Sequence, residues 1–243
     1  MAIATLEGKA QLKTERTVVS VPHLFGPGYY KNIMEEIDSQ KLYRPTTAEV
    51  LSFIDLALQN PDEPDCLEIL KRFKQKQLFL WAGIEKNHNP DYVELKRRFR
   101  QGYLWTCTES LSFPEGVLVY DNKDGTISKT SKKLLELLNE GDKRVRFVEP
   151  GFEKGFISIS DFLKNPYTIA QIGGEDMLET AERVAKACYE REACILGPDR
   201  ADFDKRWLTA LFSGCENNSG FYLNGCLNSV SHSGFSPGIY QTA

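Results

Sequence analysis

Apolar residues recur at spacings of three and four through residues 46–59, and this period predicts a helix with one face committed to a core. Thr46 and Glu49 have the spacing of a capping box, in which each side chain accepts from the backbone N–H of the other residue. Asn60 and Pro61 follow the last apolar residue of the pattern, so the helix is expected to end there.

The same helical period appears in shorter segments on both sides of this one. It predicts helices over residues 30–39, 63–76, 131–138 and 175–190, and a short helix that is capped by Ser160 and stops near Asn165 and Pro166. The apolar run 78–84 is short enough to be either a buried strand or the end of a helix, and the pattern does not separate the two.

Strict alternation of apolar and polar residues predicts strands in other parts of the chain. They are expected over residues 17–21, 103–113, 116–120 and 144–148, with turn residues at 121–125. Helices and strands follow one another without a regular strand-helix-strand order, which is typical of the α+β class. We expect residues 18–21 to pair with the last strand of the chain, which would join the N-terminal region to the same domain.

Composition and charge narrow the range of partners. The 243 residues are 41% hydrophobic, which is enough for a substantial core, and the net charge is −4. An acidic chain lacks the basic surface that displaces counterions from phosphates, so we expect no nucleic-acid partner. Residues 1–16 lack the apolar core of a signal peptide and no run is long enough to span a bilayer, so the chain is expected to be cytoplasmic, without membrane insertion.

The search for catalytic chemistry gives little. None of His23, His88 and His232 has a spacing to Cys, Asp or Glu that fits a metal site, so we expect no metal and no other cofactor. The six cysteines are spread too widely for a disulfide framework, so reduced thiols are the default. A thiolate at Cys215 or Cys226 activated by His232 is the one catalytic alternative, although no orienting acid is identifiable.

Residues 213–236 differ in composition from the rest of the chain. They contain no Lys, Gln, Met or Trp and a single Glu, Glu216, where the chain average predicts about five residues of these five types. Serine, asparagine, glycine and tyrosine are also the residues of antibody paratopes, in which aromatic rings give contact area and small polar groups give adaptable hydrogen bonds. Such a segment cannot bury itself, so it needs support from the apolar segments 206–211 and 234–240.

Several motifs around this segment resemble the variable proteins of diversity-generating retroelements of archaea and bacteria. They are VRFVEPGF at 145–152, KNPYTIA at 164–170, GGE at 173–175, RWLTAL at 206–211 and GFSPGI at 234–239, with a weaker likeness at 44–51. In that family a reverse transcriptase copies a template with errors at adenines, and the copy replaces the 3′ end of the target gene. The resemblance implies a C-type-lectin-like fold with additional N-terminal helices.

The domain organisation expected from this resemblance is an N-terminal tail, 1–16, and one elaborated lectin-like domain, 17–243. Its helical elaboration would cover about 29–100, and its diversified segment about 213–236. Randomised Asn codons with a fixed third-position pyrimidine cannot encode Lys, Glu, Gln, Met or Trp, which accounts for the composition and makes Glu216 a fixed position.

The resemblance implies a ligand-binding protein that is not an enzyme, with no catalytic residue, whose partner is a protein or a cell-surface molecule. Display on a surface or a virion is compatible with this role. Tyr222 and Phe221 are the expected aromatic anchors. The variable ligand-binding residues are expected to be Cys215, Asn217, Asn218, Ser219, Phe221, Tyr222, Asn224, Cys226, Asn228, Ser229, Ser231, His232 and Ser233.

Two other classes of function stay open at this stage. One is an enzyme on a lectin-like scaffold, resembling formylglycine-generating oxidases, that uses Cys215 or Cys226. The other is a structural protein whose polar segment is a disordered tail.

Overall fold

The computed structural model describes residues 3–6, 9–13, 18–73, 104–127, 130–188, 192–198, 205–213, 221–226 and 234–240. Its helices are α1 (Tyr30–Ser39), α2 (Thr47–Gln59), α3 (Pro64–Phe73), α6 (Ser131–Asn139), α7 (Ile159–Lys164), α8 (Pro166–Gln171) and α9 (Leu178–Cys188), and the 3₁₀ turn η1 (Glu175–Met177) precedes α9. Its strands are β1 (Ile3–Leu6), β2 (Lys9–Lys13), β3 (Val18–Gly28), β4 (Leu104–Phe113), β5 (Gly116–Asp121), β6 (Val145–Val148), β7 (Gly155–Ser158), β8 (Glu192–Leu196), β9 (Arg206–Ser213), β10 (Phe221–Cys226) and β11 (Gly234–Tyr240).

The described strands join into one mixed sheet of eleven, in the order β1-β2-β3-β11-β4-β9-β10-β8-β7, with β5 and β6 branching from β4. β3 and β11 pair antiparallel, with Val19 opposite Ile239. This pairing confirms the predicted contact between residues 18–21 and the last strand. Helices and strands are mixed without βαβ order, so the predicted α+β class is also confirmed.

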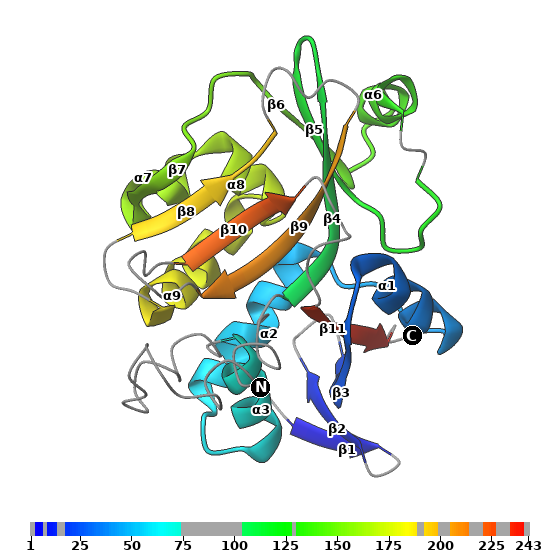
Figure 1. Ribbon diagram of the computed structural model, residues 1–243, viewed down its shortest axis with the longest axis vertical. Helices are drawn as coiled ribbons and strands as arrows, with labels where there is room; N and C mark the ends of the chain where they lie inside the picture. The colour runs from blue at the N-terminus through cyan, green and yellow to red at the C-terminus, as the bar shows by residue number, and fades with distance from the viewer. Residues whose placement is uncertain are drawn as a thin grey trace, which may run out of the picture.

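Helices cover the inner face of the sheet. Figure 1 shows α7, α8 and α9 behind the strands β7, β8 and β10. The core on this side joins Leu51 of α2, Phe162 of α7 and Ala181 of α9 to Leu211 and Leu223 of the sheet. Each of these five side chains is at most 1% exposed, so this layer is the main core of the molecule.

Among the described residues, helices cover only part of the width of the outer face. Ile33 and Met34 of α1 pack on Trp105 and Leu208, which belong to β4 and β9. Further along the sheet, Leu134 of α6 packs on the outer side of β5. In Figure 1 both helices lie to the right of the strands β7, β8 and β10, whose outer face has no helix over it among the residues described.

The predicted capping box at the start of α2 is confirmed. The Glu49 N–H donates to Thr46 Oγ1 (3.2 Å) and the Thr46 N–H donates to Glu49 Oε2 (2.8 Å). α2 then runs from Thr47 to Gln59, as its apolar period predicted.

One predicted helix cap is wrong, and two neighbouring boundaries are confirmed. The cap of α7 is Ser158 and not Ser160, because the Ser158 hydroxyl accepts from the Asp161 N–H (3.1 Å). The predicted end of this helix near Asn165 and Pro166 is confirmed, since α7 ends at Lys164. Asn165 then caps a further helix, α8, with Pro166 in its first turn. The turn between β4 and β5 is at 114–115. The turn predicted at 121–125 is confirmed, since Asp121 ends β5 and the Gly125 N–H donates to the Asn122 carbonyl (3.3 Å).

Other predictions are met in part. The helix predicted over 175–190 begins as the 3₁₀ turn η1 before α9, and the strand predicted at 17–21 continues through two prolines to Gly28. Within the predicted tail, 1–16, the strands β1 and β2 form a hairpin against β3. The run 78–84 and the helical elaboration beyond residue 73 lie outside the described residues.

Candidate functional site

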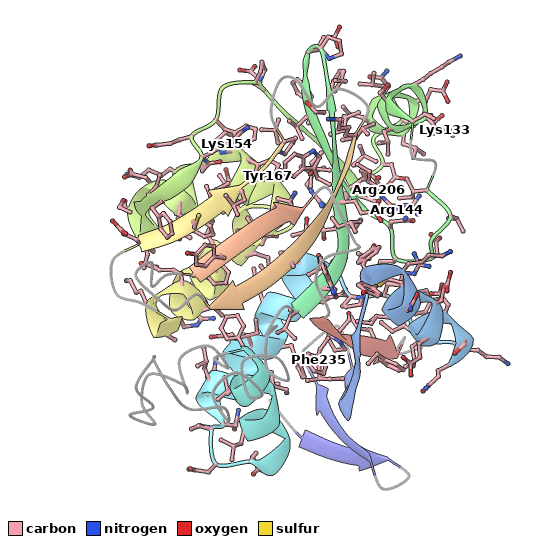
Figure 2. All side chains as sticks on the ribbon, viewed as in Figure 1. Lys133, Arg144, Lys154, Tyr167, Arg206 and Phe235 are labelled. Atoms are coloured by element: carbon pink, nitrogen blue, oxygen red, sulfur yellow. The ribbon has the colours of Figure 1, made fainter. Side chains whose placement is uncertain are left out.

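Three strands frame the compositionally unusual segment. β9 and β10 form an antiparallel pair in which Ser213 lies opposite Phe221. Leu104, the first residue of β4, pairs with both Leu211 of β9 and Phe235 of β11. The end of β9 and the starts of β10 and β11 therefore meet at one end of the sheet, where Figure 2 labels Phe235.

Most of the predicted binding residues belong to the two connections between these strands. They are Cys215, Asn217, Asn218 and Ser219 between β9 and β10, and Asn228, Ser229, Ser231, His232 and Ser233 between β10 and β11, and all of them lie outside the described residues. Asn224 and Cys226 are on β10, where their backbones pair with Ala210 and Leu208. The predicted set is thus gathered on one strand and on the two connections that flank it.

The prediction that Phe221 is a ligand-binding residue is wrong. Its ring is 0% exposed and meets Phe162 edge-on at 5.7 Å between centroids, with Phe73 at 6.4 Å. Two residues further along β10, Leu223 is equally buried, at 1%. A side chain enclosed by the main core cannot contact a ligand, so Phe221 supports the site from beneath.

Tyr222 lies on the opposite side of β10. Its side chain is half-buried and meets Phe156 of β7 edge-on, with centroids 5.5 Å apart and an interplanar angle of 86°. Cys194 of β8 lies between them, because it is opposite Tyr222 in one pairing and opposite Phe156 in the other. Tyr222, Cys194 and Phe156 therefore form a row across three strands on the outer face.

The outer face of β7, β8 and β10 exposes large apolar side chains. Phe156 of β7 is 39% exposed and Leu196 of β8 is 40% exposed, whereas Ala193 and Ile195, which alternate with Cys194 and Leu196 along β8, are fully buried. The sequence reasoning missed Phe156 and Leu196, because each lies in a strand of four or five residues, too short for a secure alternation signal.

A buried carboxylate secures the neighbouring part of the sheet. Glu109 of β4 is 0% exposed and accepts from Tyr30 Oη (2.9 Å) and Tyr120 Oη (2.7 Å), and Arg206 Nη1 of β9 is 3.6 Å from Glu109 Oε2. Burial, together with the adjacent Glu109 charge, raises the pKa of Tyr30 and of Tyr120 well above the ordinary range. These phenols stay neutral donors, so the cluster fixes α1, β4, β5 and β9 together and has no free acid or base.

A second polar network crosses the inner face beneath β9. Thr209 Oγ1 donates to Gln171 Oε1 (2.8 Å), and Gln171 Nε2 donates to Tyr167 Oη (2.9 Å). Tyr167 and Ser110 share a hydrogen bond of 3.0 Å, and Thr106 Oγ1 donates to the Thr209 carbonyl (3.3 Å). These buried bonds link β4, β9 and α8, so the support of the site is rigid.

Catalytic and metal chemistry finds no support in the described part of the chain. No group of three or more His, Cys, Asp or Glu side chains there could hold a metal ion. Cys66, Cys107 and Cys194 are free and buried. Burial raises the pKa of the Cys107 thiol, and raises that of Cys194 to about 11, so neither is an activated nucleophile. Of the predicted thiol candidates, Cys215 and the side chain of Cys226 lie outside the described residues.

The helices that the structure describes are all too short or too polar to cross a bilayer.

Comparison with known proteins gives one structural likeness. No family model and no curated protein matches the chain. A solved structure from work on the accommodation of massive sequence variation in Nanoarchaeota by the C-type lectin fold is similar over 93% of this chain and 99% of that chain. The two share 14% sequence identity and superpose with a TM-score of 0.49, a level at which nothing of that protein's function transfers.

Proposed function

We propose that this protein binds a ligand through a variable surface made by β10 and its two flanking connections. The lectin-like fold and the retroelement origin of the variation, both implied by the sequence motifs, are part of the proposal. Adenine-directed mutagenesis would rewrite the outward and connecting positions within 213–236 and leave the supporting residues unchanged. The protein would act as a binding protein and not as an enzyme.

The observation that carries the proposal is the division of β10 into two sides. Phe221 and Leu223 enter the main core, while Tyr222 between them lies half-buried on the outer face. β10 is also hydrogen-bonded on both sides, parallel to β8 and antiparallel to β9. Outward side chains can change on such a strand at little cost to the core, because backbone pairing and inward residues hold the strand in place.

The chemistry of the variable segment favours a protein or another cell-surface molecule as the partner. Tyrosine, asparagine and serine give contact area and adaptable hydrogen bonds, and the residues of the segment bring little charge. The exposed Phe156 and Leu196 add a fixed apolar area beside Tyr222. An acidic chain without a basic patch in this segment gives no reason to expect nucleic acid.

The first experiment is to sequence the DNA around the gene and look for a near-copy of the codons for residues 211–238. A copy that differs from the gene almost only where the copy has adenine, near a reverse-transcriptase gene, supports the proposal and marks each variable position. In the copy, the codons that correspond to Phe221 and Leu223 should have no adenine at any position where a base change would replace the apolar side chain. The absence of any copy overturns the retroelement origin.

A second experiment tests the binding role directly. The segment 213–236 is replaced by segments that keep Phe221 and Leu223 and vary the other predicted positions, and folding is followed by thermal unfolding. Most such variants should keep the melting temperature within a few degrees, and display selection should recover variants with different partners. Unfolding of most variants would contradict the proposal.

A further inference from the structure

The strand β7 forms one margin of the sheet, and its free edge is open. Among the described strands β7 pairs with β8 alone, and no backbone hydrogen bond joins residues 155–157 to any other described segment. Figure 1 labels β7 at the left of the sheet, next to α7. A Cβ atom added at Gly155 would meet nothing within 4 Å, so there is space beside the strand. Part of the backbone of β7 therefore has donors and acceptors that a further strand could use.

The open edge of β7 lacks the features by which proteins protect a sheet margin. Those features are charged residues, proline and bulges. β7 has the sequence GFIS, and its register with β8 is uninterrupted from Gly155 to Ser158. β6 also pairs on one side alone among the described strands, but it carries the charged Arg146. The contrast indicates that the edge of β7 is available for pairing.

The side chains along this edge define what an added strand must carry. Phe156 is exposed on the outer face and would lie beside one side chain of the added strand. Two residues along, Ser158 is next to two exposed carboxylates, since Glu192 is opposite it on β8 and Asp161 Oδ2 accepts from its hydroxyl (2.6 Å). In the part of the chain that the structure describes, neither carboxylate is in an ion pair. The complementary strand thus has an apolar residue at Phe156 and a basic residue at Ser158.

The length of the edge decides between a second copy of the chain and a short partner segment. The strand does not extend further at either end, because Gly155 has a φ of 89° and α7 begins at Ile159. Four residues span about 13 Å. Pairing over this length buries far less than the roughly 800 Å² per partner of a stable interface between folded proteins. An extended segment needs no larger area, because backbone hydrogen bonds supply much of its affinity.

We propose that the open edge of β7 binds an extended segment of another protein, which adds to the sheet as a further strand. The backbone of the segment pairs with β7, and one of its apolar side chains packs on Phe156. A lysine or arginine two residues away lies beside Glu192 and Asp161. β7 is outside the segment 213–236, so this site neither uses the variable residues nor depends on the function proposed for them.

The test is calorimetric titration of the full chain with the capped peptide TKTVTVT, whose lysine and valines share one face of a strand. The peptide should bind at one site and slow the amide hydrogen exchange of residues 155–158. Proline in place of the central valine removes a backbone donor and should weaken binding about tenfold. Glutamate in place of the lysine should also weaken it, by about threefold to tenfold, because it meets like charges at Glu192 and Asp161.

Variants of the protein locate the site. Phe156→Lys places a charge where the apolar side chain packs, so it should weaken the peptide at least about tenfold. Phe147→Lys is the matched control, because Phe147 is an equally exposed phenylalanine on the edge strand β6, and it should leave the affinity unchanged. Glu192→Gln should reduce the preference for the lysine peptide over the glutamate peptide.

Three results would overturn the proposal: no saturable binding, unchanged exchange at residues 155–158, or equal affinity in Phe156→Lys and the unsubstituted chain. Sedimentation of the chain alone adds a fourth, since dimers that Phe156→Lys abolishes would assign the edge to a second copy. Thermal unfolding verifies that Phe156→Lys is folded, and Phe156→Ser carries the test if it is not.

Discussion

Neighbouring residues on β10 have opposite roles, and the difference is measurable. Phe221 fills a space between Phe162 and Phe73 in the main core, so Phe221→Ala leaves a cavity. We expect it to lower the free energy of unfolding by about 3–5 kcal/mol. Tyr222→Ala removes a half-buried ring from the outer face and should cost about 1 kcal/mol, mainly through the lost contact with Phe156. Denaturant unfolding measures both.

The comparison of the two variants is what tests the division of β10. Phe221→Leu serves as a control, because it keeps an apolar side chain and should cost clearly less than Phe221→Ala. Equal losses for Phe221→Ala and Tyr222→Ala would show that the strand does not separate core from surface in the way described.

Tyr167 makes stability sensitive to alkaline pH. Burial raises the pKa of Tyr167 to about 12, whereas an unfolded tyrosine titrates near its ordinary value of about 10. Between these values the unfolded chain has lost the phenol proton and the folded chain keeps it, so stability is full below pH 10 and falls as the pH rises. One proton over this interval amounts to about 3 kcal/mol.

Tyr167→Phe should therefore make the loss of stability between about pH 10 and pH 12 less steep by the share of one proton, while Tyr30 and Tyr120 keep their own contributions to the slope. It should also lower stability at neutral pH by removing two buried hydrogen bonds. Urea unfolding at a series of pH values measures the slope. Leu163→Ala, which removes no titrating group, should displace the curve without changing its slope. An unchanged slope in Tyr167→Phe would refute the assignment.

At the scale of elements, one asparagine joins α7 and α8 to the segment that precedes β7. Asn165 Oδ1 accepts from the Tyr167 N–H (3.0 Å) and the Thr168 N–H (3.3 Å), and Asn165 Nδ2 donates to the Glu153 carbonyl (2.9 Å). Asn165→Ala loses the cap and a buried bond, so we expect a loss of about 2 kcal/mol. Asn165→Asp keeps the accepting oxygen and should lose less. Thermal unfolding ranks the two variants, and equal losses would mean that the cap contributes little.

Helices with strong local signals were predictable, and the strands of the functional region were not. α1 and α2 have clear apolar periods, and the capping box at Thr46 fixes the start of α2, so their boundaries agree with the structure. β8 and β10 are five and six residues long, and β10 lies in a segment rich in glycine and asparagine, residues that are depleted in strands. Its pairing with β8 and β9 is a tertiary contact that no local pattern reports.

The candidate site shows the same limit. Composition and motifs identified the segment 213–236, because the absence of whole residue types is visible without any structure. Composition does not show which residues of the segment face the core. For this reason the prediction placed Phe221 on the binding surface. Apolar residues are too few around Phe221 to form a period from which the direction of its side chain could be derived.

At the scale of the whole molecule, the strands β3 and β11 depend on each other for their stability. β11 pairs with β3 on one side, and Phe25 of β3 is buried with α1 in the outer core. β1 and β2 add to the far side of β3 as a hairpin and make no pairing with β11. The domain from residue 17 onward should therefore fold without residues 1–16 and fail without residues 1–28.

Two truncated chains test this dependence. The chain that begins at residue 17 should keep a cooperative thermal transition, with a modest loss from the missing hairpin. The chain that begins at residue 29 leaves one side of β11 unpaired and opens the outer core beside Trp105, so it should be unfolded or aggregated in circular dichroism and size-exclusion measurements. Cooperative unfolding of the shorter chain would show that β3 is dispensable, and that the segment 213–236 is held by β4, β8 and β9 alone.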